Sequence, residues 1–429
     1  MPDHRFGIES LCLHAGQQPD PVTGARAVPI YQTTSFVFDS PEHAASLFNL
    51  QTFGNVYSRI SNPTVAVFEE RMAALEGGRA ALATASGLAA QMTAFLTLCE
   101  AGDEIVAART LYGGSFSQLD VSLRRLGIRT VFVDVRDPAS VRAAINERTR
   151  AVYGEIIGNP GLNVMDLEAI GEICRDAGVP LIIDNTLASP YLCRPLERGA
   201  DIVVHSATKY IGGHGTTMGG VIVESGRFPW DNGRFPQMVE PSEGYHGVRF
   251  HETFGDFGFT MKARMETLRT LGPALSPFNA FLLLQGLETL PIRMERHVAN
   301  AQAVADFLSG HPQVSWVNYP GLPESSEFML AQRYLPKGAG GILSFGIRGG
   351  QPAGERFIES LQMISHLANV GDARSLVIHP ASTTHRQLSA DEQIAAGVPP
   401  DMIRLSVGIE TIDDIVWDLE QALARLQGG

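Results

Sequence analysis

Lysine and cysteine are both scarce in this chain. Of its 429 residues, three are lysines and four are cysteines. The cysteines are widely spaced, without a CxxC pair or the Cys/His spacing of a zinc site, which argues against a disulfide framework and a structural metal. We expect reduced core thiols at Cys12, Cys99, Cys174 and Cys193.

The chain also lacks a long apolar run and any long run of like charges. Its longest apolar stretch, around FNAFLLLQGL, is too short to cross a bilayer, and MPDHRFGIES has no apolar targeting core. Asp and Glu (46) outnumber Lys and Arg (33), giving a net charge of −13 that disfavours bulk nucleic-acid binding. We expect a cytoplasmic protein with no nucleic-acid or membrane partner.

Four histidines are loosely grouped but do not form a metal-binding pattern. No pair has the i, i+4 helical spacing or the glutamate partner of a zinc helix. We therefore expect no metal site at His205, His214, His246 or His251.

The chain does contain a regular alternation of strand and helix patterns between about residues 60 and 225. SNPTVAVFEERMAALEGG has Asn62 as a helix N-cap and Pro63 at the first helical position. Several strand patterns, such as PLIID, are continuous apolar runs typical of strands buried on both faces. The pattern predicts an α/β fold with a mostly parallel sheet over residues 61–277.

The remainder of the chain is organised differently. Residues 225–260 are rich in Gly, Pro and aromatics and form an irregular insertion. Such a long segment is usually functional or an excursion over a neighbour, and we expect it to help cover the functional site. A long helical pattern from about residue 278 should break near Pro291. It leads into a smaller α+β unit over 278–429, with strands VSWVNYP and GGILSFGI and helices ERFIESLQMISHL and IDDIVWDLEQALARL.

Two charged residues stand at predicted strand ends, where parallel sheets bind ligands. Asp184 closes PLIID, and a carboxylate there is costly to bury without a partner. Lys209 follows DIVVHSAT, and an amine beside apolar surface can have its pKa lowered and act as a nucleophile or base. Taken singly, each also fits a plainer role, a turn aspartate or a lysine pointing to solvent.

A third candidate is an anion site. ATASGLAA combines a strand, a Ser86-Gly87-Leu88 turn and a helix start, whose free amides suit a phosphate. The hydroxyls of Ser206 and Thr208 are further donors. Many small-residue turns bind nothing, so this signal is weak by itself.

A fourth candidate is YSRISNP. Alternate side chains of an extended segment share a face, so Tyr57 and Arg59 could both reach a phosphate. An ordinary surface pair is the alternative.

The ordered motifs together resemble the Cys/Met-metabolism family of pyridoxal-phosphate enzymes, of the aspartate aminotransferase fold type (fold type I). The resemblance runs from HAGQQPDPVTGARAVPIYQTTSF through YSRISNPT, LYGGSF, GNPGLNVMDLEAI, IIDNT and HSATKYIGGHG to LANVGDARSLVIHPASTTH and RLSVGIE. It implies pyridoxal 5'-phosphate as cofactor and a large cofactor-binding domain followed by a smaller C-terminal domain.

The resemblance also assigns roles to individual residues. Lys209 would bind the cofactor aldehyde and move protons, Asp184 would pair with the pyridinium nitrogen, and Tyr112 would stack on the ring. Other cofactor contacts would come from Ser86, Gly87, Leu88, Asn159, Thr186, Ser206 and Thr208, and substrate contacts from Tyr57, Asn159, Asn369 and Arg404. Residues 1–60 would form an arm whose Tyr57 and Arg59 reach the site of a neighbouring subunit, in a homotetramer built as a dimer of dimers.

Within the family, TKYIGGHGTTMGG, the insertion around EPSEGYHG and the LANVG motif resemble the branch that transfers the aminocarboxypropyl group of O-acetyl-L-homoserine to sulfide or methanethiol. The products would be homocysteine or methionine, and acetate. Cystathionine synthesis and γ-elimination are alternatives, although Gly114 replaces a cysteine typical of methionine γ-lyases. Ile156 and Leu88 also depart from the usual family residues. A non-catalytic binding protein is disfavoured by Lys209, Asp184 and Arg404, and a nucleotide-binding protein by the absence of G-x-G-x-x-G and of a Walker loop.

Overall fold

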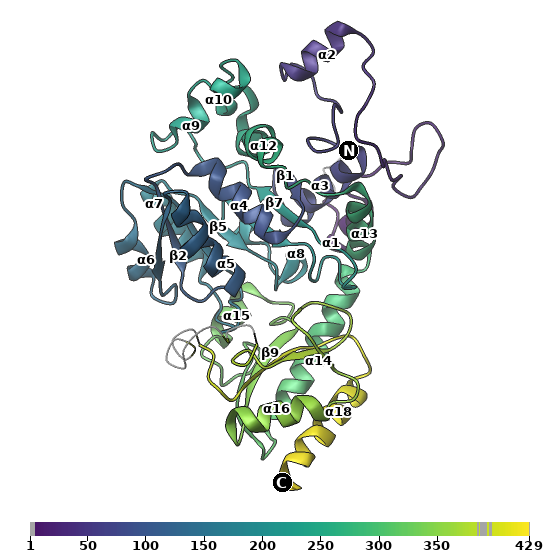
Figure 1. Cartoon of the computed structure of the whole chain (residues 1–429), viewed down its shortest axis with the longest axis vertical. Helices are drawn as coiled ribbons and strands as arrows, with labels where there is room; N and C mark the ends of the chain where they lie inside the picture. The colour runs from purple at the N-terminus through teal and green to yellow at the C-terminus, as the bar shows by residue number, and fades with distance from the viewer. Residues whose placement is uncertain (1–4, 384–385, 387–392, 394–396, 429) are drawn as a thin grey trace.

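The computed structural model describes residues 5–383, 386, 393 and 397–428. Thr384 and His385, which end one of the motifs above, lie outside the described residues. Two sheets lie one below the other in Figure 1 and are joined by the long helix α14 (Leu290–Ser309). The four cysteines are buried and free.

The larger sheet confirms the predicted α/β class. Its seven strands have the order β1-β7-β6-β5-β4-β2-β3. β7 is antiparallel to both of its neighbours, and the remaining neighbouring pairs are parallel. β2, β5 and β7 are buried along their whole length, which explains their apolar sequences. The strands are β1 (Ala80–Thr84), β2 (Glu104–Ala108), β3 (Arg129–Val133), β4 (Thr149–Glu155), β5 (Leu181–Asp184), β6 (Ile202–Ser206) and β7 (Gly220–Glu224).

The helices of this part follow local signals in the sequence. The Asn62 side chain accepts the amide of Thr64, so α3 (Pro63–Glu76) begins at Pro63, and it ends at Gly77, whose φ of +69° suits glycine. α3 packs on β1 and β7, and α4 on β6 and β7. The other helices between the strands are α4 (Gly87–Leu98), α5 (Gly113–Ser117), η1 (Gln118–Leu123), α6 (Pro138–Ala144), α7 (Leu167–Ala177), α8 (Ser189–Leu192) and η2 (Pro195–Arg198).

The smaller sheet has five strands in the order β10-β11-β12-β9-β8. α14 packs on β8 and β9, and α16 on β9 and β12. The predicted break near Pro291 is confirmed, because α13 ends at Glu288 and α14 begins at Leu290. The elements are α13 (Pro277–Glu288), β8 (Val314–Asn318), α15 (Phe328–Tyr334), β9 (Ile342–Ile347), α16 (Gly350–Ser360), β10 (Ser365–His366), β11 (Leu376–Ile378), β12 (Met402–Ser406), α18 (Ile412–Ala424) and η6 (Arg425–Gly428).

One predicted helix is too long. The pattern ERFIESLQMISHL predicts a single helix, but α16 ends at Ser360 and His366 belongs to β10. The buried carboxylate of Asp418 accepts the amides of Gln362, Met363 and Ile364 at 2.8 to 2.9 Å. Because a carboxylate on α18 holds these amides, they cannot continue the helix.

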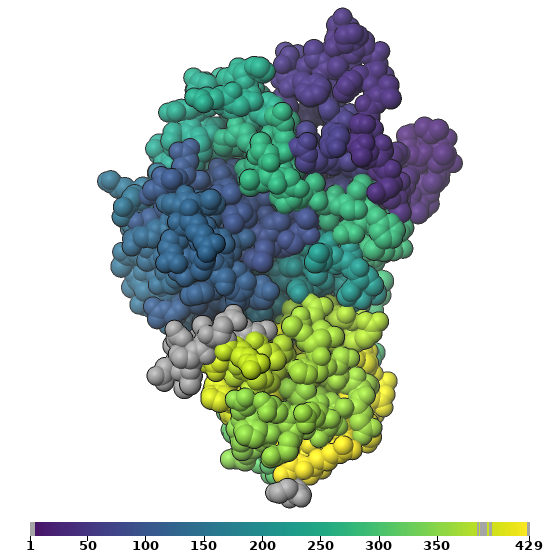
Figure 2. All heavy atoms as spheres, in the orientation of Figure 1, coloured from purple at the N-terminus to yellow at the C-terminus, as the bar shows by residue number. Residues whose placement is uncertain are grey.

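α1 (Ile8–His14) packs against α3, α13 and α14. Two later segments lie at the far end of the larger sheet from the smaller sheet. The residues around α2 (Pro41–Phe48) stand out from the body in Figure 2 (purple). Beside them lie α9 (Pro236–Val239), η3 (Glu243–Tyr245) and α10 (Phe250–Phe254) of the insertion. The chain then continues through η4 (Gly255–Phe257), α11 (Gly258–Lys262), η5 (Ala263–Leu268) and α12 (Arg269–Leu271).

Candidate active site

A cavity of about 500 Å³ lies between the carboxyl ends of the large-sheet strands and the smaller sheet. It brings together residues from β5, β6 and β12 that are far apart in the sequence. All but two of the predicted site residues line it, namely Ser86, Gly87, Leu88, Tyr112, Asn159, Asp184, Thr186, Ser206, Thr208, Lys209, Asn369 and Arg404.

Lys209 lies just beyond β6, with its amine directed toward the smaller sheet. The Nζ atom donates a hydrogen bond of 2.6 Å to the side-chain oxygen of Asn369. Burial, and then the positive charge of Arg404, lower the pKa of Lys209 from 10.5 to about 8. A substantial fraction of the amine is therefore neutral at mildly alkaline pH, as a nucleophile or a base requires.

This pKa leads to a prediction about pH. The family resemblance implies that Lys209 binds the aldehyde of pyridoxal phosphate. On mixing the cofactor-free protein with this aldehyde, the rate of that attachment should rise with pH and level off above about 8, because only the neutral amine can attack. An ordinary lysine would show a rise up to about pH 10. Stopped-flow absorbance across a pH series measures this rate. Arg404→Met should move the plateau to higher pH, and a rate that kept rising to pH 10 in the unaltered protein would contradict the prediction.

Asp184 is the last residue of β5 and is 9% exposed. One of its carboxylate oxygens accepts the side-chain amide of Gln91 at 2.9 Å, and the other accepts the backbone amide of Thr186 at 2.9 Å. The Tyr153 hydroxyl lies 3.5 Å from the oxygen that Gln91 contacts. Gln91 was not predicted, because a glutamine within a helical pattern carries no signal of its own.

Glu155 is a second unpredicted residue of the cavity wall. It ends β4 directly beside Asp184 on β5. Its two oxygens accept the backbone amides of Tyr112 and Asn159, at 2.7 and 2.9 Å. Burial, and then the charge of Asp184, raise the pKa of Glu155 well above its ordinary value. The place of Glu155 at a strand end was its only signal in the sequence. By binding their backbone amides, Glu155 fixes the main chain of two predicted site residues, Tyr112 and Asn159.

The first turn of α4 lies close against the end of β6 and has free backbone amides of the kind that suit an anion. Ser86 caps the helix by accepting the amide of Ala89 at 3.2 Å, which leaves the amides of Gly87 and Leu88 without a helical acceptor. A Cβ on Gly87 would lie 2.6 Å from the Cβ of Ser206, so glycine permits this close approach. The Thr186 hydroxyl accepts the amide of Ser206 at 2.8 Å and joins the end of β5 to that of β6.

Two further contacts shape the walls of the cavity. The Tyr112 ring is half exposed there, and a Cβ on Gly114 would lie 2.5 Å from its Cε1, so Gly114 leaves room for the ring. Across the cavity, the Arg404 guanidinium on β12 donates a 3.0 Å hydrogen bond to the side-chain oxygen of Asn159. Burial lowers the pKa of Arg404, which nevertheless remains a cation at neutral pH.

Tyr57 and Arg59 do not line this cavity. Tyr57 forms an isolated bridge with Ser35 in the N-terminal segment, and its side chain is 41% exposed. The Arg59 guanidinium donates to the backbone oxygen of Arg269 and lies 5.3 Å from the centre of the Tyr57 ring. Neither residue therefore completes the cavity of its own chain.

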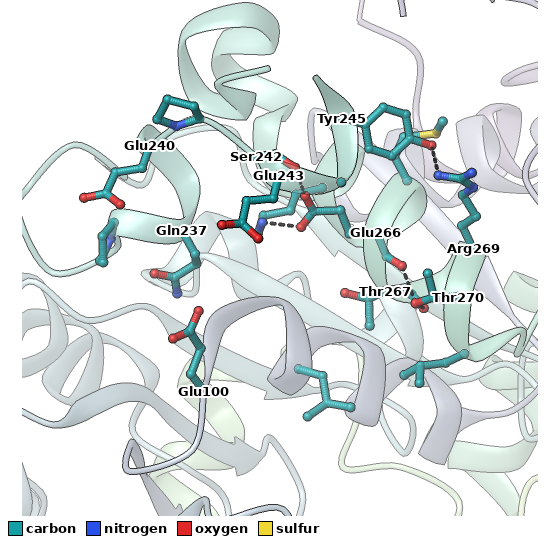
Figure 3. Close-up of a pocket in the computed structure, with 17 residues that line it drawn as sticks. Glu100, Gln237, Glu240, Ser242, Glu243, Tyr245, Glu266, Thr267, Arg269 and Thr270 are labelled. Atoms are coloured by element: carbon teal, nitrogen blue, oxygen red, sulfur yellow. Dashed lines mark hydrogen bonds and ion pairs between the residues drawn. The ribbon is translucent and has the colours of Figure 1, made fainter. Parts of the chain in front are cut away.

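The prediction that the insertion covers the site is wrong for the chain's own cavity. No described residue of 225–260 lines it. Three aromatic side chains of the insertion, Tyr245, Phe250 and Phe254, instead lie with Met261 and Met265 in a cluster separate from the main core. Its other buried aromatic side chains belong to the main core, namely Phe228, Trp230, Phe235 and Phe259. Figure 3 shows the hollow beside the separate cluster, of about 740 Å³, where the Glu266 carboxylate accepts hydrogen bonds from Ser242 and Lys262, and Arg269 donates one to the Tyr245 hydroxyl.

The cavity has the chemical groups that pyridoxal phosphate requires. An amine with a lowered pKa, a buried carboxylate and a cradle of amides and hydroxyls converge from neighbouring strand ends. The fold and the site thus define a pyridoxal-phosphate-dependent enzyme of fold type I. The chain belongs to the Cys/Met metabolism PLP-dependent enzyme family, whose model matches residues 9–424.

Several relatives resemble the chain over almost its whole length. An O-acetyl-L-homoserine sulfhydrylase of Leptospira meyeri is 54% identical, over 98% of this chain and 97% of its own. A homocysteine synthase of Schizosaccharomyces pombe is 55% identical, over 99% of each chain. A Campylobacter jejuni structure, a candidate O-acetylhomoserine (thiol)-lyase that carries a pyridoxyl-lysine monophosphate, has a TM-score of 0.95 at 39% identity, covering 98% of this chain and all of that one.

The part of the chain that the structure describes has no helix that is long and apolar enough to pass through a membrane. Across the same residues, no group of three or more His, Cys, Asp or Glu side chains is arranged to hold a metal ion.

Proposed function

We propose that the protein catalyses a γ-replacement in which O-acetyl-L-homoserine and sulfide give L-homocysteine and acetate, with methanethiol as a second sulfur donor that gives methionine. The C–O bond at the γ-carbon breaks, acetate leaves with the bonding electrons, and a C–S bond forms at the same carbon. The observation that carries the proposal is a cavity in which Lys209, Asp184 and Arg404 converge, in a chain 54 to 55% identical to relatives named for this chemistry.

Cofactor binding is assigned to three sets of residues. Lys209 would hold pyridoxal phosphate covalently and Asp184 would pair with its ring nitrogen, while Tyr112 packs on the ring. The phosphate would be bound by the first turn of α4 and by hydroxyls of the β5 and β6 ends, from Ser86, Gly87, Leu88, Thr186, Ser206 and Thr208. When bound, the cofactor withdraws electrons from the substrate α-carbon and so makes its proton removable.

The remaining steps belong to the side chains of this protein. Arg404 binds the substrate α-carboxylate through two N–H donors, as a bidentate pair. Asn159 accepts a hydrogen bond from the Arg404 guanidinium and so orients the guanidinium and the carboxylate that it binds. Lys209 Nζ takes the proton from the α-carbon and serves as a proton carrier for the carbons beyond it. Asn369, which holds the Lys209 amine at 2.6 Å, keeps that atom facing the substrate side of the cavity.

The site would be completed by a second subunit. We assign residues 1–60 to an arm that delivers Tyr57 and Arg59 to the neighbouring chain, 61–277 to the cofactor domain and 278–429 to the small domain, in a cytoplasmic homotetramer. The position of Tyr57 and Arg59 outside their own cavity supports this arrangement.

The test is to incubate the purified holoenzyme with sulfide and, separately, acetyl-, succinyl- or phosphohomoserine, and to follow homocysteine. Acetylhomoserine is expected to be consumed fastest, with one acetate released per homocysteine. If no acylated homoserine is consumed while methionine or cystathionine is broken down, the transferase proposal fails. Formation of cystathionine from cysteine as the preferred acceptor would favour cystathionine synthesis instead.

A further inference from the structure

The inner face of α14 carries three buried polar side chains in a row. Arg293, His297 and Asn300 are spaced i, i+4 and i+7, and they are 5%, 0% and 3% exposed. We call these three residues the polar row of α14. Buried polar groups are costly unless they are hydrogen bonded, so the partners of the row indicate its purpose.

Arg293 binds the segment that directly follows Lys209. Its guanidinium donates to the backbone oxygens of Tyr210 at 2.7 Å, of Ile211 at 3.3 Å and of Gly286 at 2.6 Å. A Cβ on Gly213 would lie 2.1 Å from Nη1 of Arg293, and the φ of Gly213 is +71°, so the chain is shaped closely around this cation. Among the described residues, no carboxylate forms an ion pair with Arg293.

His297 and Asn300 bind the segment that follows β12, the strand of Arg404. The Nδ1 atom of His297 is 2.7 Å from the backbone oxygen of Val407, and Asn300 donates to the backbone oxygens of Gly408 at 3.0 Å and Glu410 at 2.9 Å. Burial lowers the pKa of His297 to about 4, so the ring is neutral at pH 7 and the proton on Nδ1 is donated to the carbonyl.

The two halves of the row are in contact with each other through Tyr210. The His297 and Tyr210 rings pack edge to face, with centroids 5.1 Å apart. One rigid helix face thus binds the backbone next to Lys209 at one end and the backbone next to Arg404 at the other.

We propose that the polar row of α14 positions Lys209 relative to Arg404, so that a substrate held by its carboxylate presents its α-carbon to the amine. Arg293, His297 and Asn300 are positioning residues in this proposal and touch neither substrate nor cofactor. The inference rests on the proposed roles of Lys209 and Arg404. A merely stabilising helix face could be apolar, without the cost of desolvating a guanidinium that has no carboxylate partner.

The first variant tests the Lys209 end. Arg293→Lys keeps the positive charge but loses the planar guanidinium, whose N–H groups bind several backbone carbonyls at once. It should lower kcat by about tenfold or more with KM changed by less than about twofold, since misplaced catalytic groups slow the chemical step. The plateau of cofactor attachment against pH should move upward as the Lys209 segment loosens and the amine becomes better solvated.

The second pair of variants tests the Arg404 end. His297→Leu leaves the Val407 oxygen without a donor, whereas His297→Asn can donate from nearly the same place as Nδ1. Titrating the cofactor absorbance of the holoenzyme with L-norvaline, an amino acid with no leaving group, measures amino-acid binding, to which the contact between its carboxylate and Arg404 contributes. The dissociation constant should rise about tenfold in His297→Leu, and His297→Asn should restore most of the affinity.

A control variant is available on the same helix. Arg296 is exposed, so Arg296→Gln should match the unaltered protein in every measurement. The proposal is overturned if Arg293→Lys and His297→Leu lower only the melting temperature, leaving kcat, norvaline affinity and the pH profile unchanged, or if Arg296→Gln gives the same losses. Norvaline affinity and cofactor attachment need neither sulfide nor an acyl group. If the unaltered enzyme forms no homocysteine from sulfide and an acylated homoserine, the proposed function is wrong. The norvaline affinity and the rate of cofactor attachment still decide the role of the polar row in that case.

Discussion

Replacing Lys209 with alanine is expected to lower homocysteine formation by about 10³-fold or more, because in the proposed mechanism this one side chain both holds the cofactor and moves the α-proton. No other lysine can take its place. Lys262 is ion-paired to Glu266 in the hollow of Figure 3, and Lys337 packs on the Tyr191 ring, with its Nζ 3.8 Å from the centroid. The measurement is the initial rate of homocysteine release with sulfide and acetylhomoserine at saturating cofactor.

The matched control for this variant is Lys337→Ala, which removes a lysine outside the cavity and should retain nearly full activity. Circular dichroism would establish that both variants fold. Removing Lys209 abolishes a buried amine whose pKa is lowered, so folding should not be weakened. A Lys209→Ala enzyme that kept its full turnover would contradict the proposed mechanism.

Replacing Arg404 with methionine is expected to lower kcat/KM for acetylhomoserine by about 10²-fold, mainly through a higher KM. The substrate carboxylate would lose the guanidinium that binds it as a bidentate pair. Asn159 would lose the hydrogen bond of 3.0 Å that the guanidinium donates to its side-chain oxygen. Arg404→Lys keeps a charge without the fork and should recover only part of the loss.

The control for this pair is Arg374→Met on the same domain. Arg374 also pairs with a carboxylate, that of Asp372 at 3.2 Å, but its side chain is 71% exposed. Such surface pairs contribute little. If Arg404→Met retained its KM while only its kcat fell, the carboxylate would have to bind elsewhere.

The sequence predicted the groups that stand at strand ends. Asp184 and Lys209 could be found because a charged residue after an apolar strand has few structural reasons to be there. The residues around Ser86 gave a weaker signal, which gained weight only with the other motifs. Arg404, Asn159 and Asn369 came from the family resemblance alone, since nothing local marks them.

Apart from Gln91, whose partner is the Asp184 carboxylate, the residues that the sequence missed act through the backbone of others. Glu155 binds the amides of Tyr112 and Asn159, and Asp418 ends α16 by binding three amides. Residues whose partners are main-chain atoms leave no matching residue type elsewhere in the sequence, so pattern analysis cannot pair them. The polar row of α14 is of the same kind, because its targets are carbonyl oxygens.

The scarcity and placement of lysines have a consequence for chemical labelling. Lys262 is nearly buried against Glu266, and Lys337 lies on an aromatic ring, while Lys209 opens into the cavity. Because the Lys337 side chain is still 41% exposed, aldehydes are expected to modify the folded protein at no more than two lysine side chains, Lys209 and Lys337. Borohydride reduction of the Lys337→Ala variant should then give close to one labelled lysine per chain. Lysine-directed cross-linkers would correspondingly be poor reporters of subunit contacts in this protein, and carboxylate-directed reagents would be the better choice.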